Sequence, residues 1–510
     1  MSRETRREKN WLDRALTRIE IAGNKIPDPM ILFLGLAVAV VLLSFLLSKL
    51  GVTAVHPVTQ DVVEVNNLLS VSGLVNFISG ATNTFSTFTT MTVVLVAMLG
   101  VGICDSSGFF GVALHSSMAK IRGSRIKTTI IFAFICVMAD FTGGTGFVVM
   151  PPLAAIIFAS LGRNPLAGML CAYASVSGGF CANLLIQSMD ILNSSYTQQA
   201  IDLIGFDLTV SPAMNYYFAA AATFVLTAAS AFVTLKIVEP RLPYKPEKLA
   251  ERTDIGPGEK KAMKYALIAF GVFILFLCAG AIPSNGFLRD AEGAALSSSA
   301  PLMKGLTFLI GLMFFIPGAI YGRKSGTFKN SKDIINALGK AMADMGPYIA
   351  LCFVISQFLG LFSASNLGII LAVNGAQWLE SANFPIAVTL ILFVLFCGIL
   401  NLFMGSASAK WAILAPVFIP MFLLLGYHPA LIQIAYRIGD ACTNPISPSL
   451  AYFGILLANA KKYDKNAGMG TLMANMLPYT ISFTVLMILQ LLVFYFFKLP
   501  LGPGAPILLP

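Results

Sequence analysis

The chain has 510 residues, of which 57% are hydrophobic and only 11% are charged. A soluble domain carries about 25% charged residues, so this composition excludes a soluble fold and predicts an all-α polytopic membrane protein. The formal net charge is +10, but the basic residues sit in loops between apolar segments, which indicates membrane orientation rather than nucleic-acid binding.

Nine apolar segments have the length of about 20 residues that a membrane-spanning helix needs. The predicted spans are 29–50, 84–104, 166–190, 213–236, 263–282, 303–322, 346–364, 430–454 and 472–497. They divide the chain into a cytoplasmic N-terminal segment (1–28), a first half (29–235), a cytoplasmic loop (236–262), a second half (263–498) and a C-terminal tail (499–510).

Two further apolar stretches, 128–160 and 385–425, are too interrupted to be simple spans. The first has the centre Thr142-Gly-Gly-Thr-Gly146, and the second has the centre Gly405-Ser-Ala-Ser-Ala409. Irregular backbone at membrane depth is tolerated only where protein or a polar cavity surrounds it. Each stretch is therefore interpreted as a re-entrant hairpin, in which two half-helices meet at a tip.

The two hairpins belong to an internal repeat with an offset of 264 residues. At this offset three pairs match: Pro152 with Pro416, Gly162 with Gly426, and Pro165 with Pro429. In a membrane protein, interrupted hydrophobic segments that recur in two halves indicate a transporter binding site.

The Lys and Arg residues predict how the chain is oriented. If the N-terminus is cytoplasmic, the nine spans alternate and each hairpin returns to its own side, 28 of the 34 Lys and Arg residues lie inside. The first hairpin then enters from the cytoplasm and the second from outside, and the C-terminus lies outside. The two repeats are thus inverted, as in alternating-access transporters of the cell (inner) membrane.

A span broken by small and polar residues follows each hairpin: 166–190 holds Asn183, and 430–454 holds Asn444, Pro445 and Pro448. Proline removes a backbone donor and breaks a helix. Side-chain amides and freed carbonyls suit Na⁺, which requires oxygen ligands. Asn183 and Asn444 are therefore candidate Na⁺ ligands, although either one could instead cap a half-helix.

Charged side chains inside the membrane are candidates for function. Arg437 and Asp440 are spaced i,i+3 on one helical face and can pair, either as a structural ion pair or as a proton site that Arg437 tunes. Asp190 either handles protons at a cavity edge or sits in outside water. Asp140 and Lys410 also lie in apolar segments, and we interpret Lys410 as a snorkelling side chain outside the site.

The second hairpin carries the predicted substrate contacts. Helix N-termini at its tip offer free N–H groups to an anion, and the hydroxyls of Ser406 and Ser408 can bind a carboxylate or Na⁺. Trp411 offers an aromatic face, or else packs in the core, and Pro416 lies in the same hairpin.

Other chemistries find little support. The eight cysteines all lie in apolar stretches without a Cys-x-x-Cys pair, and the three histidines share no ligand spacing, so no metal site is predicted apart from Na⁺. Motifs of ATPases, serine hydrolases and zinc proteases are absent from the sequence. We therefore expect a transporter driven by ion gradients, rather than an enzyme, and no cofactor.

Several runs resemble the AbgT family of aminobenzoyl-glutamate transporters, and the resemblance spans nearly the whole chain. These runs are Gly405–Pro416, Tyr436–Asp440, Asn183–Asp190, Asn67–Gly73 and Leu499–Gly504. The resemblance implies a homodimer with nine spans and two hairpins in each protomer. By motif position, the family's functional residues fall on Asp190, Ser408, Trp411, Arg437, Asp440 and Pro448. The first hairpin departs from the family pattern, because Gly143 and Gly144 stand where the family often has Ser and an acidic residue.

The resemblance implies secondary transport of p-aminobenzoyl-glutamate, export of sulfonamide antimetabolites, or both, coupled to H⁺ or Na⁺. Such a small anionic aromatic substrate would lie between the hairpin tips, with its ring near Trp411 and a carboxylate near the serines. Asp190 and Asp440 would couple transport to protons. The alternative is a Na⁺-coupled dicarboxylate symporter with a similar plan.

Overall fold

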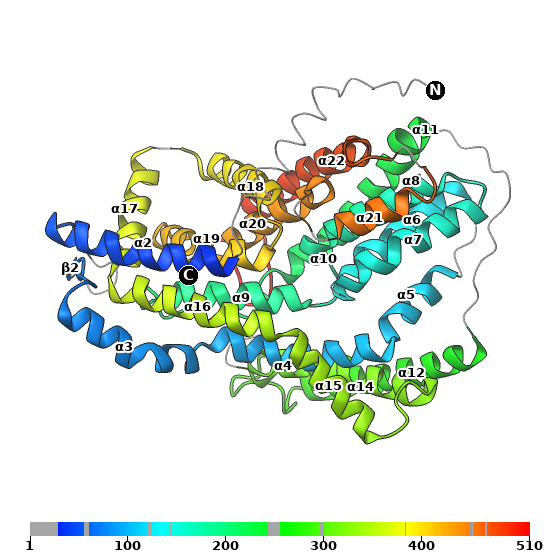
Figure 1. Cartoon of the computed structure of the whole chain (residues 1–510), viewed down its shortest axis with the longest axis horizontal. Helices are drawn as coiled ribbons and strands as arrows, with labels where there is room; N and C mark the ends of the chain where they lie inside the picture. Colours follow the sequence, from blue (N-terminus) through cyan, green and yellow to red (C-terminus); the bar gives the residue numbers. More distant parts are fainter. Residues whose placement is uncertain are drawn as a thin grey trace, which may run out of the picture.

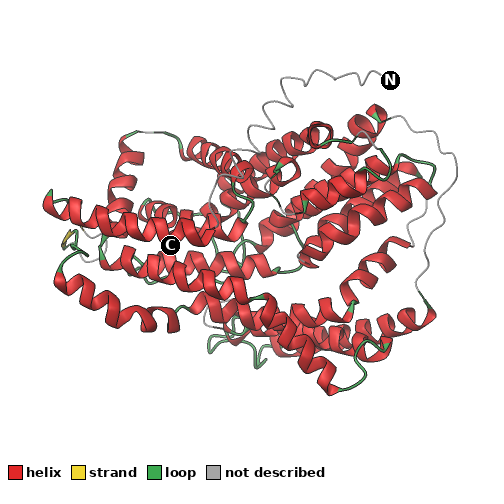
Figure 2. Ribbon diagram, in the orientation of Figure 1, coloured by secondary structure: helices red, strands yellow, loops and turns green. Residues whose placement is uncertain are grey.

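The computed structural model describes residues 29–55, 61–119, 124–142, 144–242, 256–295, 300–382, 384–448, 450, 452–464 and 467–509. These residues are mostly helical, with only two short strands (Figure 2). The predicted cytoplasmic segment 1–28 lies outside the described residues, as does the part of the loop 236–262 between 243 and 255.

The first half is arranged as follows: α2 (Pro29–Lys49), β1 (Thr53–Val55), β2 (Val62–Glu64), α3 (Val71–Ser86), α4 (Thr89–Ser107), α5 (Phe109–Ala119), α6 (Arg125–Met138), η1 (Ala139–Thr142), α7 (Gly144–Ser160), α8 (Pro165–Gly178), η2 (Gly179–Cys181), α9 (Ser188–Asp202), α10 (Tyr216–Val233), η3 (Thr234–Val238) and α11 (Glu239–Arg241) (Figure 1). The strands β1 and β2 pair antiparallel, with Ala54 opposite Val63. The segment η3 is a π-helical turn that continues α10.

The second half contains α12 (Pro257–Ala281), α13 (Pro301–Lys304), α14 (Leu306–Ser325), α15 (Ser331–Asp344), α16 (Gly346–Ala364), α17 (Leu367–Ser381), α18 (Ile386–Phe403), α19 (Ala407–Leu424), α20 (Pro429–Thr443), η4 (Asn444–Ile446), α21 (Phe453–Ala460) and α22 (Met469–Phe496). Figure 1 shows α12, α14 and α15 on the same side as α4, and α14 packs against both α4 and α12.

Nine helical segments among the described residues are long and apolar enough to cross a membrane. Seven of them coincide with predicted spans, but the other two are α18 and α19, the arms of the second predicted hairpin. The predicted spans 166–190 and 430–454 are instead shorter helices followed by breaks. Each arm has 18 residues and is about 27 Å long, close to the hydrocarbon thickness. Length therefore does not decide whether these arms re-enter, and the hairpins remain a prediction.

The residues that match at the offset of 264 play the same structural parts in both repeats. Gly162 has φ +69° and Gly426 has φ +82°, a left-handed conformation that favours glycine. Pro165 and Pro429 begin α8 and α20, where a missing N–H costs nothing. The residue before each proline caps the helix: the side chain of Asn164 accepts from Leu166 N, and that of His428 accepts from Ala430 N.

The span from α10 to α11 shows that the two repeats are inverted. At its end, the carbonyl of Leu242 accepts a hydrogen bond from the Asn164 side chain, at the start of α8. At its beginning, the Asn215 side chain donates to the carbonyl of Ala430, at the start of α20. The equivalent helix starts therefore lie at opposite ends of one spanning helix, as the Lys and Arg distribution predicts.

Each broken helix packs between the arms of its own hairpin. Helix α8 contacts α6 and α7, and α20 contacts α18 and α19. The two repeats meet where α20 contacts η2 and where α8 contacts η4. Each helix break is thereby packed against the broken helix of the other repeat.

Several elements differ from the sequence prediction. Asp190 does not close the first broken span, because the chain leaves η2, runs irregularly to Gln187 and then begins α9. The helices α5, α15 and α17 were not predicted, since they have only 11, 14 and 15 residues, below the length of a spanning helix. The C-terminal tail is docked, with Ile507 O accepting from His428 N and Leu509 N donating to Gly426 O.

Candidate functional site

An ion pair between the repeats occupies the centre of the candidate site. The Arg437 guanidinium, on α20, pairs with the carboxylate of Asp190, on α9, and Nε also donates to the Phe180 carbonyl at 3.0 Å. Asp190 caps α9, since its Oδ2 accepts from Gln187 N at 2.7 Å. The predicted pair between Arg437 and Asp440 is not formed. The long guanidinium reaches into the other repeat, where it also satisfies a carbonyl that the helix break leaves open.

Asp440 pairs instead with Lys410 of the second hairpin. The Lys410 ammonium also donates to the Asn401 side chain and, at 2.8 Å, to the carbonyl of Met404. Lys410 is only 1% exposed, so the interpretation of this residue as snorkelling is wrong. A buried ammonium requires a counter-charge and hydrogen-bond acceptors: Asp440 on α20 supplies the charge, and Asn401 and Met404 of the hairpin supply the acceptors.

The two candidate asparagines are buried and join each helix break to its own hairpin. Asn183 donates from Nδ2 to the carbonyl of Met138, at the end of α6, at 3.2 Å. Asn444 accepts from the side chain of Asn401, near the end of α18, at 2.8 Å. Both residues therefore have a capping or bracing part in the structure. Their role as Na⁺ ligands remains a prediction.

The tip of the second hairpin presents two half-buried hydroxyls. Ser406 caps α19 by accepting from Ala409 N, and its hydroxyl lies 3.4 Å from that of Ser408. The first turn of α19 therefore lies beside two groups that can each accept or donate a hydrogen bond. Such a helix start favours an anion.

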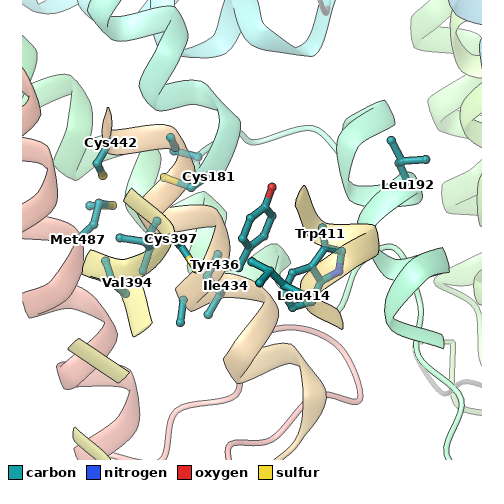
Figure 3. Close-up of a cluster of buried hydrophobic side chains, with 14 of the residues drawn as sticks. Cys181, Leu192, Val394, Cys397, Trp411, Leu414, Ile434, Tyr436, Cys442 and Met487 are labelled. Atoms are coloured by element: carbon teal, nitrogen blue, oxygen red, sulfur yellow. The ribbon is translucent and has the colours of Figure 1, made fainter. Parts of the chain in front are cut away.

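Trp411 is completely buried and stacks on Tyr436, with the ring centroids 4.7 Å apart (Figure 3). Its indole Nε1 donates to the hydroxyl of Thr197 and the carbonyl of Asn193, at 3.0 and 3.1 Å. In this conformation Trp411 therefore joins α19 to α9 rather than offering a free face. Of the two candidate prolines, Pro416 is buried inside α19 and Pro448 is half-buried after η4.

Sequence reasoning missed Asn401, which contacts more of the site than any predicted amide. Its Nδ2 donates to Thr443, Asn444 and the carbonyl of Asp440. The signal was a single amide inside the otherwise apolar segment 386–403. It also missed a chain of buried hydrogen bonds from Thr197 through Gln433 to Asn215, which links α9, α20 and α10.

A cavity of about 510 Å³ lies elsewhere, between α3 and α16. Its lining includes the neutral polar side chains of Asn66, Asn76 and Gln357, and none of its lining residues belongs to a hairpin or a broken helix. The candidate site therefore rests on the buried charges rather than on this cavity.

Inverted repeats whose broken helices meet at buried charges are the architecture of a membrane transporter. The family model of the AbgT putative transporter family matches residues 14–509, and the chain belongs to this family. It is 35% identical over 490 residues to the p-aminobenzoyl-glutamate transport protein of Escherichia coli (strain K12), covering 95% of both chains.

Two solved transporters have the same fold. The YdaH transporter of Alcanivorax borkumensis, described as having an unusual topology, is 38% identical with a TM-score of 0.88, and the match covers 94% of this chain and 100% of that one. MtrF of Neisseria gonorrhoeae, described as illuminating a class of antimetabolite efflux pumps, is 36% identical with a TM-score of 0.89, and the match covers 97% and 100%.

Proposed function

We propose that this protein is a secondary active transporter of p-aminobenzoyl-glutamate that also exports sulfonamide antimetabolites, driven by the proton gradient. The observation that carries the proposal is the ion pair between Arg437 and Asp190, which joins the two inverted repeats at their helix breaks. A carboxylate and a guanidinium at a moving junction can exchange partners with an anionic substrate or a proton. The named activities of the E. coli and Neisseria relatives support the choice of substrates.

The substrate is proposed to bind against the tip of the second hairpin. A carboxylate would accept hydrogen bonds from Ser406, Ser408 and the first turn of α19, where the helix dipole favours negative charge. Trp411 would contact the aromatic ring only after the packing against Tyr436 changes, since its side chain is buried. Asp190 and Asp440 would each release their cationic partner when their own carboxylate becomes protonated.

We further propose that the protein is a homodimer in the cell (inner) membrane, with the N-terminus cytoplasmic and the C-terminus outside. The Lys and Arg distribution supports this orientation. Reporter fusions at each terminus test it, because a C-terminal alkaline phosphatase is active only outside the cytoplasm. If the C-terminal phosphatase is inactive while a fluorescent protein fused to the same terminus is fluorescent, the C-terminus lies in the cytoplasm and the proposed orientation is wrong.

The transport test uses purified protein in proteoliposomes with labelled p-aminobenzoyl-glutamate and imposed gradients of pH or Na⁺ in either direction. We expect flux driven by the pH gradient and inhibited by sulfonamides, and its loss in Asp440→Asn. Asp344→Asn is the matched control, since Asp344 is exposed at the end of α15. Flux no greater than in protein-free liposomes would overturn the proposal. Flux of a simple dicarboxylate such as succinate, driven by Na⁺, would establish the symporter alternative.

A further inference from the structure

Asp140, at the tip of the first hairpin, is a buried carboxyl without a partner. It lies in η1 and is 5% exposed. Within the part of the chain that the structure describes, neither a hydrogen bond nor an ion pair reaches its side chain. An isolated ionised carboxylate in such surroundings costs several kcal/mol, so the group requires a proton or a cation.

The position of Asp140 places it beside the central ion pair. A Cβ atom built on Gly179 would lie only 2.6 Å from the Cβ of Asp140, so the backbones of these two residues approach closely. The next residue, Phe180, carries the carbonyl that binds Arg437. Four titratable or charged side chains are within electrostatic reach of Asp140, namely Asp190, Arg437, Asp440 and Tyr452.

The buried charges around this junction do not balance. Two cations, Arg437 and Lys410, are each paired with one carboxylate, Asp190 and Asp440 respectively. Asp140 is the third carboxyl and has no cation of its own. The cluster is therefore neutral only when it carries one additional positive charge.

The repeat explains why this charge belongs to the first hairpin. At the offset of 264, Gly144 and Gly146 of the first tip correspond to Ser408 and Lys410 of the second. The second tip thus holds a tethered ammonium among oxygen acceptors, whereas the first holds a carboxyl, glycines and two threonines, Thr142 and Thr145, whose hydroxyls already donate to a backbone carbonyl and to Asp105. Glycine supplies no side-chain oxygen for Na⁺, while a single carboxyl is sufficient for a proton.

We propose that Asp140 carries the exchangeable proton that couples transport. The proton binds to a carboxylate oxygen of Asp140 when the first hairpin faces one side of the membrane, and it leaves from the same oxygen when the hairpin faces the other. Protonation of Asp140 makes the charge cluster neutral. The first hairpin can then change the side of the membrane that it faces. This inference rests on the proposed function, since a coupling proton has meaning only in a driven transporter.

Asp140→Asn tests the proposal, because the amide resembles the neutral, protonated carboxyl but cannot release or bind a proton. In proteoliposomes we expect accumulation driven by the pH gradient to fall to the level of protein-free liposomes, while exchange of labelled for unlabelled substrate stays within about twofold of wild type. Asp140→Glu should retain driven transport. Accumulation in Asp140→Asn equal to wild type would overturn the assignment, and so would a driven flux that depends on Na⁺ instead of pH.

A second measurement needs no substrate. Infrared difference spectra of the membrane-embedded protein across a pH titration should contain the carbonyl band of a protonated carboxylic acid. We expect Asp140→Asn to lack this band, Asp140→Glu to shift it and Asp344→Asn to leave it unchanged. If Asp140→Asn does not fold, an unshifted band in Asp140→Glu would overturn the assignment. Wild-type protein that shows the band but transports no substrate would refute the proposed function alone.

Discussion

Arg437 and Asp190 lie 247 residues apart in the sequence and form an ion pair at the centre of the molecule. Arg437 belongs to the second repeat and Asp190 follows the helix break of the first. Each half of the chain therefore supplies a partner to the other. Asp190 provides the counter-charge of the guanidinium, and the same guanidinium also binds the carbonyl of Phe180. Any movement of one repeat relative to the other must keep or exchange these contacts.

Arg437→Met should destabilise the protein by about 3–5 kcal/mol, since it leaves the Asp190 carboxylate buried without its cation. The double variant with Asp190→Asn should lose less than the sum of the two single variants, because neither charge is then unpaired. Thermal unfolding in detergent measures both effects. Arg323→Met, at an exposed position, is the control and should have little effect. Additive losses would show that the pair is not coupled.

Lys410→Met should create a Na⁺ site. The change removes the ammonium from the Met404 carbonyl oxygen and from the Asp440 carboxylate, which are both ligands that Na⁺ accepts. Replacing choline chloride by NaCl at equal ionic strength should therefore raise the melting temperature of the variant. At a Na⁺ concentration a hundredfold above Kd, the gain is about 2.7 kcal/mol.

Wild type and Lys498→Met, which changes an exposed lysine, should respond equally to the two salts. If the melting temperature of Lys410→Met is also the same in NaCl and choline chloride, the oxygens around the substituted side chain do not bind Na⁺.

His428 predicts a loss of stability at acid pH. Burial lowers the pKa of His428 from 6.5 to about 4, so the folded protein holds this side chain neutral. Its stabilising contribution is complete above pH 6.5, the unfolded value, and is lost as the pH falls towards 4. The difference amounts to roughly 3 kcal/mol.

Thermal unfolding between pH 7 and 4 measures this effect. His428→Asn is the matched variant, because Asn164 caps the equivalent helix of the first repeat with the same kind of bond. It should remove this part of the pH dependence while retaining the cap. An unchanged slope in His428→Asn would assign the acid sensitivity to other groups.

Glu239→Gln should be far more harmful than Arg125→Ala. The Glu239 carboxylate accepts from buried Arg163 at 2.9 and 2.6 Å, whereas the Arg125 side chain, at 3.1 Å, is 56% exposed. Loss of the buried partner should cost about 3 kcal/mol, and loss of the exposed one less than 1 kcal/mol. Melting temperatures of the two variants test this order. Equal losses would indicate that burial does not govern the strength of these pairs.

How far the sequence predicts the fold depends on the kind of signal. The repeat was visible because Gly162, Pro165 and their counterparts Gly426 and Pro429 are demanded by local backbone geometry. Short helices such as α17 carry no comparable signal, since a partly polar segment of 15 residues does not have the length or the apolar run of a span.

By itself, the sequence determined the membrane class, the inverted repeat and which charged residues lie within apolar segments, because hydropathy, glycine and proline act locally. Only the tertiary structure decided which charges pair. Arg437 could satisfy Asp440 on its own helix or Asp190 in the other repeat, and the choice depends on where two distant helix breaks meet. Lys410 was misread for the same reason: an ammonium in an apolar segment snorkels or is buried according to acceptors that the rest of the fold brings to it.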